Sequence, residues 1–360
     1  MYISGTYFAS WSIYQYKHFV TDLPVADITH VFYAFMKIDP NTGEVQLGDS
    51  WADAEIPLES PCGGHQVKGS LGQLYELKKK RRYLKTLMSI GGWGTNDTFV
   101  AAFSTEQKMN TFVKSAVTMA NCYHFDGIDI DWEYPSTDAE ARQLLEVLYR
   151  LRVALGPDRL ISVACPGGDD TFAILRPHLP AMDKYLSFWN VMCYDYAGKS
   201  WSQKTGFHSN LFGHNGDNSM SSDSIITKYH EAGVLRHKLV LGMPAYARAF
   251  ANPAQPSIGS PFDKSTGPDD LEYKNISEKY EQFDHRKVSA FAMDSSRGLF
   301  LTYDSPISAR IKAKYVESKQ LAGGMWWCSY GDQPGERSLV GAFVDQLGRS
   351  NLDHTNNYCS

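Results

Sequence analysis

The sequence predicts an α/β fold and, within that class, a (β/α)8 TIM barrel. Short apolar runs rich in β-branched residues alternate with amphipathic, helical stretches over the whole length of 360 residues. This alternation is typical of a parallel sheet covered by helices. Eight such runs are present, and eight parallel strands, each followed by a helix, close into a barrel. An open doubly wound sheet is the alternative, but no Gly-x-Gly-x-x-Gly turn follows the first run.

The eight predicted strands are apolar over nearly their whole length, as strands buried on both faces should be. Two capping boxes predict helix starts, Ser104 with Gln107 and Thr137 with Glu140. A basic cluster at residues 78–82 follows leucines at helical spacing and predicts the solvated C-terminal end of another helix. The predicted strands cover residues 3–8, 28–36, 84–90, 127–132, 160–165, 189–194, 239–244 and 324–328.

The connection after the seventh strand is too long to lack structure of its own. It is rich in Pro and contains strand-like segments near residues 287–293 and 298–302. We therefore predict one catalytic domain over residues 1–360, interrupted at residues 249–301 by a small α+β insertion. The insertion leaves from the C-terminal end of a strand, on the face where barrel enzymes build their active sites.

Composition excludes several other classes of protein. A formal net charge of −5 argues against a nucleic-acid partner. The chain shows no signal peptide and no apolar run near the ~20 residues of a membrane helix. We therefore expect no membrane association, and a cytoplasmic protein or, if a leader was removed, a secreted one. The six cysteines lack the spacing of a zinc site or a disulfide scaffold, and Cys165, Cys193 and Cys328 lie in apolar runs that predict packed thiols.

One strand carries three acids. Asp129, Asp131 and Glu133 alternate with Ile130 and Trp132, so on a strand all three acids share one face. In a closed barrel that face is the interior, and the column rises toward the C-terminal mouth. Desolvation and like charge both raise a carboxyl pKa, so at least one group should hold a proton near neutral pH, as a general acid must. Glu133, nearest the mouth, would protonate a leaving oxygen.

Two other interpretations of this strand stay open at this point. A divalent cation would accept several carboxylates as ligands, although no His or further acid is suitably placed beside them. The acids could also lie on a solvated face, which the neighbouring Phe125, Ile128 and Ile130 do not favour.

The run from Asp126 to Glu133 resembles the D-x-x-D-x-D-x-E signature of glycoside hydrolase family 18, the chitinases. Four further segments resemble motifs of that family in the same order. They are S-x-G-G at residues 89–92, M-x-Y-D at 192–195, the strand-seven segment at 242–248 and the strand-eight segment at 323–327. The pattern is most similar to fungal-type chitinases with an inserted domain. It implies a retaining hydrolase of β-1,4 bonds between N-acetylglucosamine units.

The resemblance also implies a role for each matching residue. Glu133 would be the acid/base, while the substrate's own N-acetyl oxygen attacks the anomeric carbon. Asp131 would orient the acetamido group, with Asp129 sharing a proton beneath it, and Tyr194 and Asp195 would hold that group from the other side. The implied sugar-binding residues are Tyr7, Trp11, Trp93, Met192, Trp201, Tyr246, Arg248 and Trp327.

From the resemblance we expect a chitin or chitooligosaccharide substrate, no metal or other cofactor, and a monomer. Two alternatives remain. An endo-β-N-acetylglucosaminidase acting on N-glycans shares the acid motif. A chitin-binding lectin without hydrolysis typically lacks the terminal acid, which is present here as Glu133.

Overall fold

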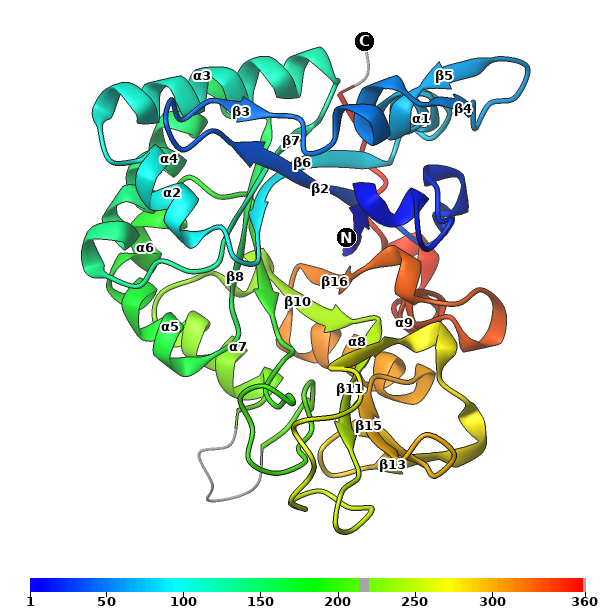
Figure 1. Cartoon of the computed structure of the whole chain (residues 1–360). Helices are drawn as coiled ribbons and strands as arrows, with labels where there is room; N and C mark the ends of the chain where they lie inside the picture. Colours follow the sequence, from blue (N-terminus) through cyan, green and yellow to red (C-terminus); the bar gives the residue numbers. More distant parts are fainter. Residues whose placement is uncertain (214–219, 359–360) are drawn as a thin grey trace.

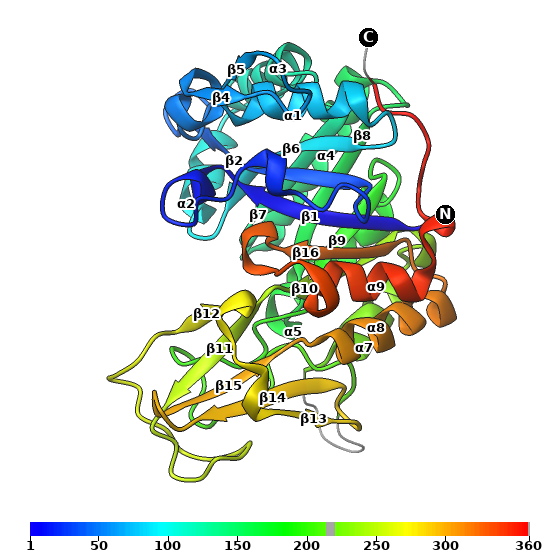
Figure 2. The same cartoon turned by 90° about the vertical axis from the view of Figure 1, so that its right-hand side faces the viewer.

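The computed structural model describes residues 1–213 and 220–358. Eight strands pair in parallel, and β1 pairs with both β2 and β16, so the sheet closes and the predicted barrel is confirmed. In Figure 2, β1 runs from right to left, so the C-terminal mouth lies at the left of that view. The barrel strands are β1 (Ile3–Ala9), β2 (His30–Ile38), β6 (Lys85–Gly92), β7 (Gly127–Trp132), β8 (Leu160–Pro166), β9 (Phe188–Met192), β10 (Leu239–Pro244) and β16 (Gly323–Trp327).

Helices surround the barrel (Figure 1). None within the described residues is long and apolar enough to cross a bilayer. The first connection was predicted to hold a helix but contains only the 3-10 turns η1 (Ser10–Ile13) and η2 (Val20–Asp22). Lys17, at a φ of 49°, and Pro24, which has no backbone donor, both interrupt a continuous helix there. The α-helices are α1 (Gly69–Lys80), α2 (Asn96–Ala102), α3 (Glu106–Cys122), α4 (Asp138–Leu155), α5 (Asp169–Leu175), α6 (Leu179–Met182), α7 (Ser222–Glu231), α8 (Pro306–Lys319) and α9 (Leu339–Leu347).

The two predicted helix caps differ in outcome. Thr137 caps α4, where its hydroxyl accepts a hydrogen bond from the backbone N–H of Glu140 at 3.2 Å. At α3 the cap is Thr105, whose hydroxyl accepts from the backbone N–H of Lys108 at 3.2 Å. The predicted cap Ser104 instead donates to the carbonyl of Ala101 at the end of α2. The prediction was one residue early because Ser and Thr are adjacent and both fit the capping pattern.

Alternate residues of the barrel strands face two different cores. From β7, Ile128, Ile130 and Trp132 belong to the large apolar layer between the strands and the helices. The barrel interior holds a smaller cluster that includes Tyr7 and Phe32, whose rings stack with centroids 4.7 Å apart. The remaining residues of β7 therefore point into this interior.

Between β10 and α8 the chain forms a separate antiparallel sheet with a core of Phe250 and Phe300. Its first strand starts two residues after β10 ends, and both views show the sheet beside the barrel mouth (Figures 1 and 2). In spatial order the strands are β12 (Asp270–Glu272), β11 (Tyr246–Ala251), β15 (Leu299–Tyr303), β14 (Ser289–Asp294) and β13 (Glu281–Asp284), and the helical turns are η6 (Tyr273–Asn275) and η7 (Glu278–Tyr280).

Smaller elements complete the described structure. Strand β3 (Val45–Gln46) adds to β2, and β4 (Pro57–Glu59) pairs with β5 (Gln66–Lys68). A π-helical turn, η3 (Trp51–Glu55), lies between β3 and β4. The predicted packed thiols Cys165, Cys193 and Cys328 are buried and free, while Cys359 lies outside the described residues. The remaining 3-10 turns are η4 (Arg176–His178), η5 (Arg236–Lys238), η8 (Ser329–Gly331), η9 (Gly335–Arg337) and η10 (Arg349–Asn351).

The basic cluster at residues 78–82 was predicted to be solvated, but the structure buries one of its members. Lys78 is 1% exposed, and its Nζ lies 2.7 Å from Oδ2 of the fully buried Asp126. Asp126 also accepts hydrogen bonds from the backbone N–H groups of Thr86 and Tyr358, each at 2.6 Å. The last turn of α1 is thus tied through one carboxylate to β6 and to the C-terminal segment.

We predict that Lys78→Ala lowers the free energy of unfolding by about 3–5 kcal/mol, because it leaves the Asp126 charge buried without its cation. Guanidinium unfolding followed by circular dichroism measures this change. Lys80→Ala, on the exposed side of the same helix, is the control and should change stability by less than about 0.5 kcal/mol. Equal losses in both variants would contradict the assignment.

Candidate active site

The acids of β7 form a column inside the barrel. Asp129 and Asp131 are 0% and 3% exposed, and Glu133, just past the end of the strand, is partly exposed. Parallel register sets Ser89 beside Asp129 and Gly91 beside Asp131. The structure therefore brings together the three acids predicted from the alternation, with the solvated end of the column at the C-terminal mouth.

Asp129, at the base of the column, has donors on both carboxylate oxygens. Burial raises its pKa most strongly, and these hydrogen bonds act in the opposite direction without cancelling the rise. The donors also occupy the oxygens that a bound cation would need. They are Ser162 Oγ at 2.6 Å from Oδ1, Asn190 Nδ2 at 3.4 Å from Oδ1, Ser89 Oγ at 2.7 Å from Oδ2 and Tyr7 OH at 2.9 Å from Oδ2.

Asp131, in the middle of the column, has fewer hydrogen-bond partners than Asp129. Its Oδ1 has no hydrogen-bond partner among the described residues. Burial raises its pKa well above the usual range, and the charges of Glu133 and Asp129 raise it further. Because a buried polar atom without a partner is costly, this oxygen is poised to receive a proton or a donor from a bound molecule.

Glu133 holds its proton close to neutral pH. Burial raises its pKa to about 7; a hydrogen bond from Tyr134 lowers it and the charge of Asp195 raises it. A carboxylic acid that is still protonated near pH 7 can act as a general acid.

Two glycines beside the column are required by the backbone. Gly91 and Gly92 have φ values of 118° and 97°, which residues other than glycine rarely adopt. A Cβ on Gly91 would lie 2.1 Å from the carbonyl oxygen of Asp131, and one on Gly92 would lie 2.5 Å from the Phe35 ring. The two glycines of the S-x-G-G pattern thus let β6 lie close to the backbone of β7 and to the Phe35 ring.

A fourth carboxyl group, that of Asp195, lies at the mouth after β9. Its Oδ1 accepts hydrogen bonds from Tyr246 OH at 2.8 Å and Arg248 Nε at 2.7 Å. Burial alone would raise the pKa of Asp195, but His208 and Arg248 hold it well below the usual range. Asp195 therefore stays ionised near neutral pH, where Glu133 still holds its proton.

His208 was not identified from the sequence. Its ring is fully buried, and Nδ1 lies 3.6 Å from Asp195 Oδ1. Burial lowers the pKa of His208, against the pull of Asp195, so the imidazole beside Asp195 is neutral at pH 7.

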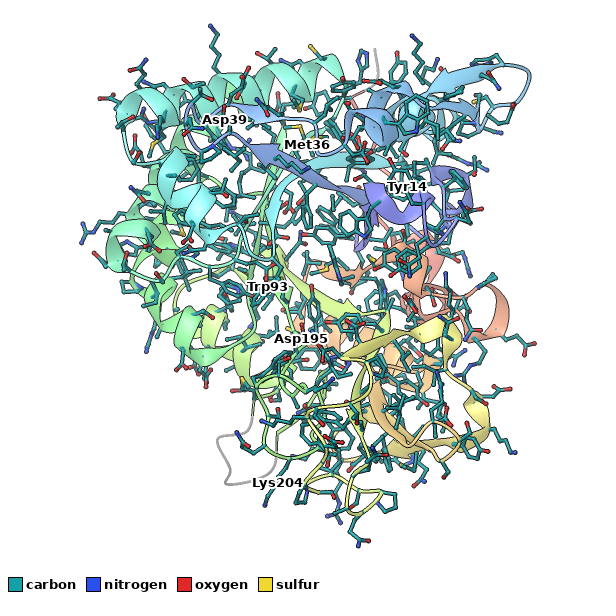
Figure 3. The ribbon with its side chains drawn as sticks, viewed as in Figure 1. Tyr14, Met36, Asp39, Trp93, Asp195 and Lys204 are labelled. Atoms are coloured by element: carbon teal, nitrogen blue, oxygen red, sulfur yellow. The ribbon has the colours of Figure 1, made fainter. Side chains whose placement is uncertain are left out.

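Aromatic rings line the mouth beside the column. The Trp327 ring stacks on Phe35 with centroids 5.6 Å apart and an interplanar angle of 19°. It also lies 5.3 Å from Tyr7 and 6.4 Å from Trp11. Trp93 is 82% exposed, and Figure 3 shows it at the centre of the view.

The remaining predicted residues occupy different levels of the site. Tyr7, expected at the sugar-binding surface, is 1% exposed; it lies inside the barrel, where its hydroxyl donates to Asp129. Met192 is likewise buried in the barrel interior. Tyr194 packs edge-on against Tyr246 with centroids 6.2 Å apart. Trp201 is 49% exposed, with the Arg248 guanidinium 4.9 Å from its ring centroid.

Phe35, Ser162 and Asn190 also belong to the site and were missed. Ser162 and Asn190 are single polar residues on otherwise apolar strands, and Phe35 is one of several aromatic residues on β2, so no local pattern distinguishes them. Within residues 1–213 and 220–358, no group of three or more His, Cys, Asp or Glu side chains is arranged to hold a metal ion.

Residues 4–332 match the model of glycosyl hydrolases family 18. The chain is 35% identical to endochitinase 1 of Metarhizium robertsii, over 96% of this chain and 85% of the relative. It is 34% identical to sporulation-specific chitinase 2 of Saccharomyces cerevisiae, over 96% and 78%. The catalytic domain of a psychrophilic chitinase B from Arthrobacter TAD20 superposes with a TM-score of 0.88 at 26% identity, over 97% of this chain and 95% of that one.

We predict that the Glu133 carboxyl titrates with a midpoint near pH 7, because burial disfavours its charged form. A carbon-13 NMR titration of glutamate carboxyls measures the midpoint, with the signal assigned by its loss in Glu133→Gln. A midpoint below about pH 5, close to that of an exposed glutamate, would contradict the burial argument.

Proposed function

The chain belongs to glycosyl hydrolase family 18, and on this basis we propose that it is a chitinase that hydrolyses β-1,4 bonds between N-acetylglucosamine units. The observation that carries the proposal is the carboxyl column of β7, whose uppermost member has a pKa of about 7. The names of the two fungal relatives support the substrate class.

In the first step Glu133 donates its proton to the glycosidic oxygen, and the bond to the anomeric carbon breaks. The acetamido oxygen of the same sugar attacks that carbon from the opposite face and forms an oxazolinium ion. Because nucleophile and electrophile belong to one molecule, the effective molarity can reach about 10⁵–10⁸ M. No carboxylate of the chain has to form a covalent bond.

Asp131 orients the acetamido group and stabilises the positive charge. Its Oδ1, without a partner among the described residues, accepts the acetamido N–H. As charge develops on the ring, the proton held by Asp131 moves to Asp129, whose four donors can accommodate either protonation state. Asp131 then carries the negative charge beside the cation.

Tyr194 and Asp195 hold the acetamido group from the other side. Asp195 is kept ionised by Arg248 and His208, and its charge helps Glu133 to keep its proton. In the second step Glu133, now a carboxylate, removes a proton from water, which opens the oxazolinium ring with net retention.

The rings and the inserted sheet form the sugar-binding groove. Trp327 is the floor at the cleavage point, while Trp93 and Trp201 stack on flanking sugars. We assign residues 1–360 to one catalytic domain in which 249–301 form the insertion, and Tyr246 and Arg248 bring its first strand to the groove. Because acids, floor and wall all come from one chain, we propose that the protein acts as a monomer.

Two other activities are less well supported. A lectin would not need a carboxyl held protonated near pH 7 at the top of the column. An endo-β-N-acetylglucosaminidase shares the acids, and cleavage of N-glycans without cleavage of chitooligosaccharides would favour it.

We predict that Glu133→Gln lowers kcat on chitotriose carrying a fluorescent leaving group by about 10²–10⁴-fold, because the general acid is lost. The amide has nearly the same shape, so calorimetric affinity for the uncleaved sugar should be retained. Equal turnover by wild type and variant would remove Glu133 from this role.

We predict that Asp131→Asn lowers kcat by about 10²–10³-fold, since it removes the charge that stabilises the oxazolinium ion. Once its proton has moved to Asp129, Asp131 carries a negative charge beside Glu133 that an amide cannot carry, so the pKa of Glu133 is lower in the variant, the alkaline limb of the pH–rate profile moves to lower pH and the optimum narrows. The limb falls as pH rises because Glu133 loses its proton there. An unchanged profile would count against proton sharing in the column.

A further inference from the structure

The loop that follows β9 is joined to the inserted sheet. In this segment, residues 195–206 or the β9 loop, Ala197 belongs to the small apolar core of the insertion around Phe250. Farther along, the backbone N–H of Thr205 donates to the carbonyl of Ser260 at 2.9 Å. The β9 loop therefore starts at the barrel mouth and continues as part of the insertion.

Lys199 ties the middle of the β9 loop to the segment just before β12. Its Nζ donates to the carbonyl of Gly267 at 2.6 Å and lies 3.7 Å from Oδ1 of Asp269. Only 16% of the Lys199 side chain is exposed. Holding a long side chain in one conformation costs entropy, and a charge-assisted hydrogen bond that is shielded from water offsets this cost. Lys199 thus fixes the loop rather than extending into solvent.

The same part of the loop positions the ring of Trp201. The backbone N–H of Trp201 donates to the carbonyl of Gly198 at 3.3 Å, which closes residues 198–201 into a turn that contains Lys199. The indole lies against Gly198, where an added Cβ would be 2.3 Å from a ring atom. Trp201 is still 49% exposed, so part of its ring is open to a ligand.

Arg248 links this indole to the acids of the mouth. Its guanidinium lies 4.9 Å from the centroid of the Trp201 ring, at the distance of a cation–π contact. Its Nε also donates to Oδ1 of Asp195 at 2.7 Å. Arg248 is therefore held from the barrel side by a carboxylate, whereas the place of Trp201 depends on the turn that carries it.

We propose that Lys199 is a positioning residue for substrate binding. By tying the turn 198–201 to the insertion, it holds the Trp201 indole where that ring stacks on a flanking sugar. This inference rests on the proposed function, which assigns Trp201 to such a sugar. Lys199 acts through Trp201 and not on the sugar itself. Since a ring that is already ordered loses little entropy when a ligand binds, Lys199 contributes to affinity and not to bond cleavage.

The first test is hydrolysis of the soluble N-acetylglucosamine hexamer by Lys199→Met, which keeps an apolar stem and removes the ammonium. We expect KM to rise about three- to tenfold. We expect kcat to stay within about twofold, because Arg248 remains bonded to Asp195. Lys199→Arg, which keeps a charged donor, should recover most of the affinity. Lys204→Met is the control and should change neither constant, since Lys204 is an exposed lysine of the same loop that Figure 3 shows at the lower margin of the molecule, away from Asp195.

A double-mutant cycle separates this role from a general loss of structure. Calorimetric affinity for the hexamer is measured in the Glu133→Gln background, alone and with Lys199→Met, Trp201→Ala or both. Because Lys199 acts through Trp201, Lys199→Met should weaken binding by no more than about twofold once Trp201→Ala is present. Additive losses, an unchanged affinity in Lys199→Met, or an equal loss in Lys204→Met would overturn the role. If the wild type does not cleave the hexamer, the proposed function fails, and these affinities still decide whether Lys199 positions Trp201.

Discussion

A carboxylate inside a closed barrel is stable only when its oxygens find donors or protons, and much of this structure follows from holding Asp129 and Asp131 there. The surrounding strands supply two serines, an asparagine and a tyrosine to Asp129 alone. Glycines on β6 let the neighbouring backbone pass close by. Asp131 is left short of partners, so the column is fully satisfied only when a proton or a ligand is present.

Two acids at the barrel mouth, Glu133 and Asp195, have different protonation states because their surroundings differ. Burial and the charge of Asp195 favour the neutral form of Glu133. Asp195 lies against a guanidinium and an imidazole, which favour its charged form. Two carboxyl groups at one opening can therefore play opposite parts at the same pH, one giving up a proton while the other supplies a fixed charge.

Features that repeat along the chain could be predicted from sequence, and features made by single residues could not. Apolar runs located all eight barrel strands, and the alternation in β7 placed its acids on one face. Phe35 is one of several aromatic residues on its strand, and His208 lies in a connection between strands, so only the fold shows that both reach the site. Lys78 looked like one member of a solvated basic cluster, but burial of the α1 end against Asp126 overrode that composition.

The pairing of β1 with β16, with Ile3 opposite Gly323, has a consequence for biosynthesis. Strand β1 cannot acquire this neighbour until β16 has emerged from the ribosome. During that interval one edge of the growing sheet is open, and open edges recruit other strands. Nascent chains of this protein are therefore vulnerable to misassembly until β16 has been made, and holdase chaperones should engage them in that interval.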